Sequence, residues 1–463
     1  MTTTLLASLA VLLHVGGMLA ALHALMRTRT APGAVAWVLG LLLLPYVTLL
    51  PYLFLGRRHF RGHVAVPAAR LPSGQAKAPT DAGADAACAR HAAIASLLGT
   101  RFHAGQALQL LIGGEATFAA IFAAMAQAEH SVLVQFFVIH DDQIGRRMQR
   151  ALLDCAARGV AVCVLYDGVG SHDLPRAWVA TLRAGGVAVH PFATRNWSNR
   201  LQVNFRNHRK IVVVDGRQGF VGGLNVGDEY LGRKPPLAPW RDTHLALQGP
   251  AVADLEQAFA GDWRWITGAD PPLRGGAAAC GPVHTLIAAT GPADDQESCS
   301  LLFVALINGA RHRLWLTTPY FVPDHAVGAA LRLAVLRGVD VRILLPARPD
   351  HRTVFLSSSL HAWVALRAGV RVFRYQPGFM HQKVVLVDDD TAVVGSMNLD
   401  SRSLRLNFEV AAVNVDPHFA AAVQAMLQAD FAQAREIDQR EYLAAPLPQR
   451  VLMHVARLFD PLL

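Results

Sequence analysis

The pattern His-x-Lys-x4-Asp occurs twice in this chain of 463 residues. None of the three residue types is abundant enough to explain this, since chance predicts only about 0.01 occurrences of such a pattern. A repeated set of three chemically capable side chains therefore predicts a duplicated functional element. The two copies, offset by 173 residues, are His208, Lys210 and Asp215, and His381, Lys383 and Asp388.

The two motif lysines are unusual because the chain is nearly devoid of lysine. Only four of its 43 basic residues are lysines, and Lys210 and Lys383 are two of them. Side chains two residues apart on a strand share a face, so each lysine lies beside its motif histidine. The residues that follow are almost all Val, Ile or Leu, which predicts burial of both strand faces. A buried ammonium group is costly unless it meets an anion or a carboxylate.

Such motifs could act together if the two copies pack around an approximate two-fold axis. Two imidazoles would then face each other across a cleft with two ammonium groups beside them. The ammonium groups could neutralise a phosphate, one neutral imidazole could attack phosphorus, and a second, protonated imidazole could protonate the leaving oxygen. This chemistry predicts phosphoryl transfer without a metal or another cofactor. No cluster of histidines and cysteines has zinc spacing.

The motif aspartates leave two interpretations open. Asp215 and Asp388 could act chemically with the histidine and lysine of each motif. Each also stands in a turn-like setting directly after a strand, where it could cap the turn or pair with the lysine.

A glycine-containing element follows each motif at the same interval. Asn225 and Asn398 are equivalent within it and could donate amide hydrogens to phosphate oxygens. Ser396 could add a hydroxyl group that its counterpart Gly223 cannot. We therefore expect Asn225, Asn398 and Ser396 to bind the substrate phosphate, in two halves that are not chemically identical.

A nucleophilic histidine usually needs an acid that holds its other ring nitrogen. Asp242 lies downstream of the first motif and Glu409 downstream of the second. These two acids are the candidates for orienting the histidines, and the alternative is an ordinary acid at the start of a strand.

Further repeats indicate the fold that positions these residues. RGVAV at 158–162 recurs as RGVDV at 337–341, and LRAG at 182–185 recurs at 366–369. In each place a helix ends at glycine and an apolar strand begins, which is typical of helix-to-parallel-strand joints. The sequence predicts an α/β fold of two tandem lobes with pseudo-two-fold symmetry, the first over residues 101–270 and the second over residues 271–463.

The amino-terminal region is strongly apolar. Residues 5–26 and 34–56 contain no Asp, Glu, Lys or Arg, and they predict a membrane-anchoring helical hairpin over residues 1–62. Two prolines in the second segment also allow a kinked or re-entrant helix, and a cleaved signal peptide is the competing interpretation. Three arginines follow the second segment, at positions 57, 58 and 61, against two in the loop, at positions 27 and 29, and this small excess favours a cytoplasmic body and a multi-pass topology. Residues 63–100 are predicted to be a linker.

The overall charge, the cysteines and the carboxy-terminal segment do not by themselves identify a function. A formal charge of +9 suits anionic lipid headgroups and nucleic acid equally well. Five cysteines without a CxxC pair predict ordinary reduced thiols. Near the carboxy terminus, an apolar helical face could dock on lipid or on the body, and packing on the body is the favoured interpretation. That face consists of Val451, Leu452, Val455, Leu458 and Phe459.

The two motifs resemble the defining element of the phospholipase D superfamily, and the chain as a whole resembles the bacterial cardiolipin synthases within it. The closer resemblance also rests on the paired amino-terminal apolar segments. The matching stretches are NFRNHRK at 204–210, TPYFVPD at 318–324, NFE at 407–409 and ARLFDPLL at 456–463.

The resemblance implies one active site at the interface of two lobes and a covalent phosphohistidine intermediate. His208 is expected to attack the phosphodiester of one phosphatidylglycerol, with His381 as general acid and then base. Glycerol would leave, and a second phosphatidylglycerol would resolve the intermediate to give cardiolipin. The family pattern implies that the lysines and asparagines bind phosphate and that Glu409 orients a histidine. Asp242 matches less closely, because its distance from His208 differs from that of Glu409 to His381.

The resemblance also implies anionic phospholipid substrates and a bacterial inner-membrane location. No nucleic acid partner is expected. A phospholipase D-type hydrolase or another phosphatidyltransferase would use the same site, and a nuclease of the superfamily would leave the membrane segments unexplained. A membrane scaffold with a degenerate site is disfavoured because both motifs are complete.

Overall fold

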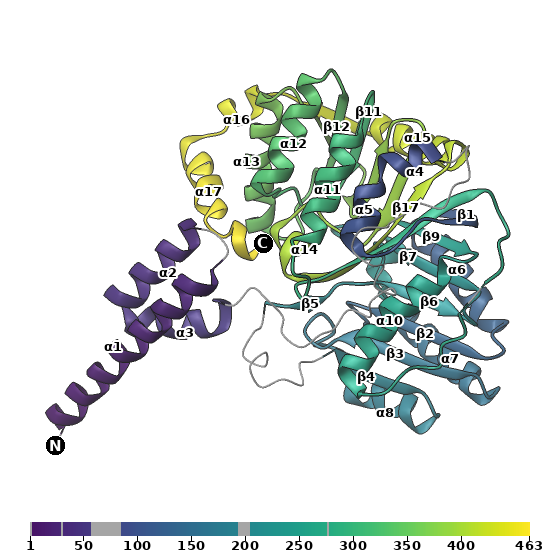
Figure 1. Ribbon diagram of the computed structural model, residues 1–463, viewed down its shortest axis with the longest axis horizontal. Coiled ribbons are helices and arrows are strands. Elements are labelled where there is room, and N and C mark those ends of the chain that lie inside the picture. Colours follow the sequence, from purple (N-terminus) through teal and green to yellow (C-terminus); the bar gives the residue numbers. More distant parts are fainter. Residues whose placement is uncertain (1, 29–30, 57–84, 193–203, 276) are drawn as a thin grey trace. The chain divides into compact units, whose positions relative to one another are not determined.

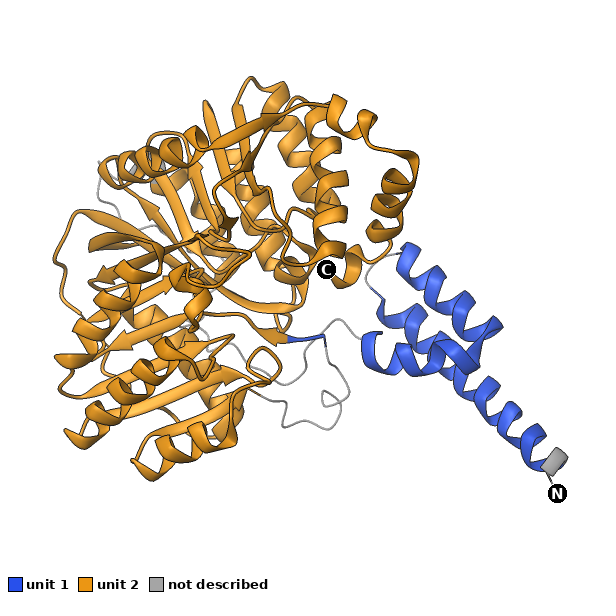
Figure 2. Cartoon of the chain, turned by 180° about the vertical axis from the view of Figure 1, so that it is seen from behind, with its two compact units in different colours: residues 1–63, 193–205 blue, residues 64–192, 206–463 orange. Residues whose placement is uncertain are grey.

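The computed structural model describes residues 2–28, 31–56, 85–192, 204–275 and 277–463. Contacts divide the chain into two compact units (Figure 2). The amino-terminal unit comprises residues 1–63 with 193–205. The body comprises residues 64–192 with 206–463.

The amino-terminal unit contains three apolar helices that pack on one another: α1 (Thr2–Arg27), α2 (Ala31–Leu43) and α3 (Pro45–Leu55). Among the described residues, α1 is the helix that is long and apolar enough to cross a bilayer. Since a helix rises about 1.5 Å per residue, α2 and α3 are each too short to cross a hydrocarbon core of about 30 Å. The second predicted segment is therefore broken into two short helices. Pro45 disfavours helical backbone at Leu44, so the kinked alternative is the one that the structure supports.

The predicted linker of residues 63–100 is shorter than expected. Its residues up to 84 lie outside the described part of the chain, but α4 (Asp85–Arg90) and α5 (Ala92–Leu98) are helices of the body. Ile94 of α5 is fully buried in the core of the second lobe. The last part of the predicted linker therefore belongs to the folded body.

The body contains two successive sets of elements that repeat one another (Figure 1). The first lobe has β1 (His103–Ile112), α6 (Gly113–Ala126), β2 (Ser131–Phe136), α7 (Gln143–Ala157), β3 (Ala161–Asp167), α8 (Arg176–Ala184), β4 (Ala188–Phe192), β5 (Arg206–Asn207), β6 (Ile211–Val214), β7 (Gln218–Gly222), η1 (Asp228–Leu231), β8 (Trp240–Arg241), β9 (Thr243–Gln248) and α10 (Val252–Thr267).

The second lobe has β10 (Val283–Thr290), α11 (Ser298–Gly309), β11 (Arg313–Thr317), α12 (His325–Leu336), β12 (Asp340–Pro346), α13 (Arg352–Arg367), β13 (Arg371–Tyr375), β14 (Phe379–Met380), β15 (Val384–Val387), β16 (Thr391–Gly395), α14 (Ser401–Arg405), β17 (Asn407–Val415), α15 (Pro417–Ala432), β18 (Ala434–Ile437), α16 (Arg440–Ala444), α17 (Leu447–Arg457) and η2 (Asp460–Leu462).

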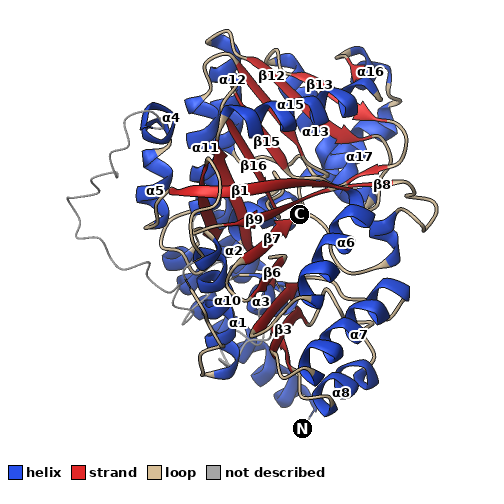
Figure 3. Cartoon of the chain, turned by 90° about the vertical axis from the view of Figure 1, so that its right-hand side faces the viewer, coloured by secondary structure: helices blue, strands red, loops and turns tan. Residues whose placement is uncertain are grey.

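The strand order confirms the duplicated α/β fold. In the first lobe the order is β1-β9-β7-β6-β2-β3-β4, and in the second it is β10-β17-β16-β15-β11-β12-β13 with β18 added at the edge. The three strands β2, β3 and β4 are parallel, as are β11, β12 and β13. Antiparallel pairing of β1 with β10 joins the two halves into one continuous sheet (Figure 3).

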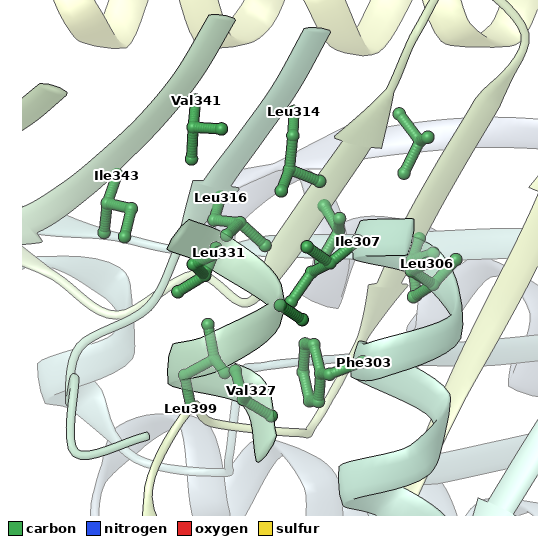
Figure 4. Close-up of a cluster of buried hydrophobic side chains, with 14 of the residues drawn as sticks. Phe303, Leu306, Ile307, Leu314, Leu316, Val327, Leu331, Val341, Ile343 and Leu399 are labelled. Carbon is green, nitrogen blue, oxygen red and sulfur yellow. The ribbon is translucent and has the colours of Figure 1, made fainter. Parts of the chain in front are cut away.

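Helices cover both faces of this sheet, as the layered arrangement of an α/β fold requires. Helices α6, α7 and α8 bury one face of the first lobe, and α11, α12 and α13 bury the equivalent face of the second. Figure 4 shows the latter core, in which Phe303 and Ile307 of α11 meet Leu314 and Leu316 of β11. Helices α10 and α15 contribute to a third core that spans both lobes. The lobes are therefore fused by their sheet and by shared apolar packing.

The strands that follow the motif lysines lie at the centre of each half-sheet. Every residue of β6 and β15 is buried, which confirms the expectation of strands covered on both faces. Strand β6 lies between β2 and β7, and β15 lies between β11 and β16. Each motif histidine and lysine therefore comes directly before a central strand of its half-sheet.

Candidate active site

The motif histidines are held in place by the opposite lobe. The short strand β5, just before His208, pairs with β17 of the second lobe, and His208 N donates to Phe408 O at 2.9 Å. In the same way β14 pairs with β8 of the first lobe, and His381 N donates to Arg241 O at 2.8 Å. Phe408 directly precedes Glu409, and Arg241 directly precedes Asp242. Each histidine is therefore placed beside an acid of the other lobe.

This pairing joins each histidine to an acid across the lobe interface. His208 Nδ1 lies 2.9 Å from Glu409 Oε2, and His381 Nδ1 lies 2.7 Å from Asp242 Oδ2. The sequence order had set each acid against the histidine upstream of it in its own lobe, and the structure exchanges these partners. Each motif histidine takes its acid from the other lobe, so the two motifs form one composite site.

The unequal spacing of the two acids has a local cause. Asp242 follows Asn225 by 17 residues, whereas Glu409 follows Asn398 by 11. The extra residues of the first lobe lie around η1 and the segment before β8. Both acids nevertheless flank equivalent strands, Asp242 just before β9 and Glu409 within β17. The insertion alters the sequence distance and leaves the geometry intact.

The hydrogen bonds define how each ring is presented. Both acids are fully buried and face Nδ1, so we assign the Nδ1 proton to the carboxylate contact. This tautomer leaves the lone pair on Nε2, which is the atom that would attack phosphorus. At His381, however, Lys383 Nζ lies 3.0 Å from Nε2. Among the described residues, Nε2 of His381 thus has an ammonium group beside it, whereas Nε2 of His208 has no hydrogen-bond partner.

The two lysines lie inside the same charged cluster. Lys210 is fully buried and its Nζ donates to His208 O at 2.7 Å, while Lys383 Nζ lies 2.9 Å from His381 Nδ1. Both lysines interact electrostatically with Asp242 and with Glu409. Burial lowers the pKa of Lys383 to about 8, and it lowers the pKa of Lys210 well below its usual range. The expected carboxylate partners of the buried lysines are therefore these two acids.

The buried charges of the site set the protonation states of its histidines and acids. Burial lowers the pKa of His208 and of His381 to about 4, so both imidazoles are neutral at pH 7. Burial alone would raise the pKa of Glu409, but His208 and Lys210 outweigh it and hold this pKa at about 2. The negative charges of Glu409 and Asp242 in turn favour the ammonium form of both lysines. A bound phosphodiester would add one negative charge, which would raise the histidine pKa values and favour one protonated imidazole.

The Ser396 hydroxyl group is hydrogen-bonded to Glu409. It donates to Glu409 Oε2 and accepts from Val410 N at 3.0 Å. At the equivalent position, a Cβ atom added to Gly223 would lie only 2.1 Å from Asp242 Oδ1. The serine therefore fits the second lobe as a support of Glu409, and the first lobe has no room for any side chain there. The predicted phosphate-binding role of Ser396 does not fit this contact.

The two equivalent asparagines are both buried in the body. Asn225 Nδ2 donates to Tyr230 Oη at 3.0 Å, and its Oδ1 accepts from Val138 N at 3.2 Å. Asn398 Nδ2 donates to Asp400 Oδ2 at 3.2 Å. Each amide is thus held by neighbours, and the phosphate-binding role of both remains a prediction.

The motif aspartates lie at the far ends of β6 and β15 from the histidines. Asp215 accepts hydrogen bonds from the backbone N–H groups of residues 129–131, and Asp388 accepts them from those of residues 311–313. Four strand residues separate each aspartate from its lysine, a distance of more than about 13 Å along a strand. A direct catalytic role is therefore a misassignment for both, and the turn-capping interpretation fits. Both have left-handed backbone, with φ of 53° and 52°.

Substitution of Asp388 should consequently affect stability. Asp388→Ala removes the acceptor of three backbone donors and the ion-pair partner of Arg90, and it places alanine in left-handed backbone, so we expect a loss of about 2–4 kcal/mol in the free energy of unfolding. Thermal melting of the purified protein measures this loss. Asp388→Asn is the matched control, with a smaller loss, because it keeps an acceptor oxygen and tolerates this backbone. A normal melting temperature with abolished turnover would instead indicate a chemical role.

Sequence reasoning missed two acids that bind the residue between the histidine and the lysine of each motif. Asp262 of α10 binds Arg209, with Arg209 Nη1 at 2.9 Å from its Oδ2, and Asp430 of α15 accepts from Gln382 Nε2 at 2.9 Å. Arg209 and Gln382 are the residues between histidine and lysine in the two motifs. The available signal was that Asp262 and Asp430 follow the two orienting acids by 20 and 21 residues.

Glu409 is held by more donors than Asp242. Besides His208 and Ser396, Ser403 Oγ donates to Glu409 Oε1 at 2.8 Å and Asn407 Nδ2 donates to it at 3.1 Å. Asp242 accepts from His381 and from Thr243 N at 2.8 Å. The carboxylate that faces His208 is thus the more tightly fixed of the two. Within the described ranges, no group of three or more His, Cys, Asp or Glu side chains is arranged to hold a metal ion.

Comparison with known proteins agrees with this geometry. The family model described as "Cardiolipin synthase, PLD-like domain" matches residues 121–263 and 303–431, one segment in each lobe. A second model, described as "Phospholipase_D-nuclease N-terminal", matches residues 18–57. The crystal structure of phosphatidylserine synthase from Haemophilus influenzae shares the fold, with a TM-score of 0.62 over 81% of this chain and all of that chain at 16% identity. The body is therefore a pair of phospholipase D-like domains.

Curated relatives narrow the assignment. Cardiolipin synthase A of Pseudomonas fluorescens is 54% identical over 98% of this chain and 97% of the relative. Cardiolipin synthase A of Pseudomonas aeruginosa is 53% identical over the whole of this chain and 97% of that relative. The chain belongs to the phospholipase D-like cardiolipin synthase family, and it is a phosphatidyltransferase enzyme. Family membership together with the apolar helix α1 makes it a membrane-associated protein.

Proposed function

We propose that this protein makes cardiolipin and glycerol from two molecules of phosphatidylglycerol. The observation that carries the proposal is the composite site, in which two histidines are paired with acids across the lobe interface around two buried lysines. Such a site suits nucleophilic attack on an anionic phosphodiester, because the ammonium groups offset the charge that develops on phosphate oxygens. The curated relatives named cardiolipin synthase A support the choice of substrate.

In the first half-reaction, His208 Nε2 attacks phosphorus and forms a phosphoramidate bond to the phosphatidyl group. The bond between phosphorus and the glycerol oxygen breaks, and protonated His381 gives its proton to that oxygen. Glycerol then leaves. In the second half-reaction, His381 takes the proton of the terminal hydroxyl group of another phosphatidylglycerol. That oxygen attacks phosphorus, the phosphorus–nitrogen bond breaks, and cardiolipin forms with His208 restored.

The assignment of His208 as the nucleophile has two structural supports. Its partner Glu409 is fixed by four donors, so the imidazole is held firmly for attack. At His381, Lys383 Nζ lies 2.9 Å from Nδ1 and 3.0 Å from Nε2, and its positive charge reduces the basicity of the ring. A histidine in that setting is the poorer nucleophile of the two.

The membrane topology is part of the proposal. Helix α1 would cross the bilayer and α2 and α3 would form a second, broken segment, with the body on the cytoplasmic side of the bacterial inner membrane. This placement gives the site access to two substrates that both reside in the bilayer. Asn225 and Asn398 are proposed to bind the phosphate once substrate enters.

A product assay tests the proposal directly. Purified protein in mixed micelles with radiolabelled phosphatidylglycerol should yield cardiolipin and glycerol in equal amounts, and a chelator should leave the rate unchanged. Thin-layer chromatography of the lipids and an enzymatic assay of glycerol measure both products. Phosphatidic acid without cardiolipin would instead establish a hydrolase, and DNA cleavage without either lipid product would refute the lipid substrate.

A further inference from the structure

The last helix of the body has a broad apolar surface that faces solvent. Six large apolar residues of the carboxy-terminal segment are exposed, from 44% at Val455 to 77% at Leu458. At about 100° per residue, they cover an arc of about 140° on one side of the helix. This arc corrects the sequence-based expectation that the face packs on the body. Its members are Leu447, Val451, Leu452, Val455, Leu458 and Phe459.

A different side of α17 attaches it to the body. Met453 and Ala456 are buried, and α17 packs along α13 (Figure 1). Just beyond the helix, Asp460 Oδ2 lies 2.7 Å from His361 Nε2, and Arg402 donates to Leu462 O at 3.1 Å. These contacts fix both the helix and the chain end, so the exposed arc is a surface of a well-anchored element.

The charge beside the arc is positive. On the helical wheel, Arg450, His454 and Arg457 lie together on one flank of the arc, and residues 446–459 contain no Asp or Glu. A basic flank next to an apolar face is typical of a helix that lies in the headgroup layer of a membrane with anionic lipids. Arg457 is exposed, and Arg450 lies over the Tyr442 ring at the edge of the arc.

We propose that α17 is a membrane-docking helix whose apolar arc enters the interface of an anionic bilayer while its arginines contact lipid phosphates. The inference adds a second lipid contact to the one made by the amino-terminal unit, and its link to catalysis rests on the proposed function. The chain end contacts Arg402 of α14, and α14 begins three residues after Asn398. Docking of α17 would therefore fix the orientation of the second lobe and its site relative to the lipid surface.

Lipid-attached quenchers test this contact without reference to activity. The accessible cysteines Cys88 and Cys280 are replaced by serine, and an environment-sensitive fluorophore is attached at Val455→Cys in the full-length chain. The matched control is Leu336→Cys, since Leu336 is an equally apolar residue that is 83% exposed on α12. In vesicles of phosphatidylethanolamine and phosphatidylglycerol with nitroxide-labelled acyl chains, the label at 455 should be quenched at least about three-fold more than the label at 336.

Two outcomes would overturn the proposal. Equal quenching at both positions would show that the arc stays in water. A shielded label that lipid nitroxides do not quench, in vesicles as in detergent, would show that protein covers the arc, either the amino-terminal unit or a second copy of the chain.

A charge-insertion variant tests the consequence for catalysis. Leu452→Glu combined with Val455→Glu should lower turnover of phosphatidylglycerol about ten-fold in vesicles and by less than about two-fold in detergent micelles. Equal turnover of variant and parent in vesicles would refute the catalytic link. Absence of cardiolipin synthesis in the parent protein would refute the proposed function alone, because the quenching result stands without it.

Discussion

His208→Ala and His381→Ala are each expected to lower cardiolipin synthesis by about 10⁵-fold or more, because residues that act as one unit lose most of the rate when either is removed. Both rings contribute to a single composite site, and neither can replace the other in its position. The rate of cardiolipin formation in micelles measures the loss. His325→Ala, at an exposed histidine at the start of α12, is the matched control and should leave the rate nearly unchanged.

A substrate with a good leaving group separates the two roles. Loss of a general acid matters little when the departing oxygen needs no proton. A phosphatidyl ester of p-nitrophenol should therefore still transfer its phosphatidyl group to His208 in His381→Ala and release a burst of nitrophenolate. His208→Ala should give no burst, since it lacks the attacking nitrogen. A burst from His208→Ala and none from His381→Ala would reverse the assignment, and full activity of either variant would contradict the shared site.

The repeated motif made much of this architecture predictable. A lysine two residues past a histidine, before a run of β-branched residues, fixes the shared face and the burial of the strand from local geometry alone. The duplication of Lys210 as Lys383 also predicts two equivalent lobes. These conclusions need only short-range rules, which explains why the structure confirms them.

Other features depend on contacts between distant segments. The exchange of Glu409 and Asp242 between lobes follows from β5 pairing with β17 and β14 pairing with β8, and strands of two residues leave no periodic signal in a sequence. The roles of Asp215 and Asp388 depend on donors that precede other strands. For the arc of α17, the apolar spacing identifies a face but does not say whether protein or lipid covers it.

The exchange of acids between the lobes can be tested by neutralising each of the two carboxylates. Glu409→Gln and Asp242→Asn keep the size of each side chain but remove the charge that fixes the Nδ1–H tautomer, and each is expected to lower cardiolipin synthesis by about 10³- to 10⁴-fold. Ser403→Ala is the matched control. It removes one donor to Glu409 and leaves the carboxylate on His208, so its loss should be far smaller.

The activated substrate then reports which histidine each acid serves. Since Glu409 holds His208, Glu409→Gln should abolish the nitrophenolate burst together with cardiolipin synthesis. Since Asp242 holds His381, Asp242→Asn should retain the burst while its cardiolipin synthesis stays low, because the second half-reaction still needs a base. Pairing within each lobe would give the opposite pattern, with the burst lost in Asp242→Asn and kept in Glu409→Gln. The crossed hydrogen bonds thus predict that each lobe of the protein contributes the acid for the histidine of the other.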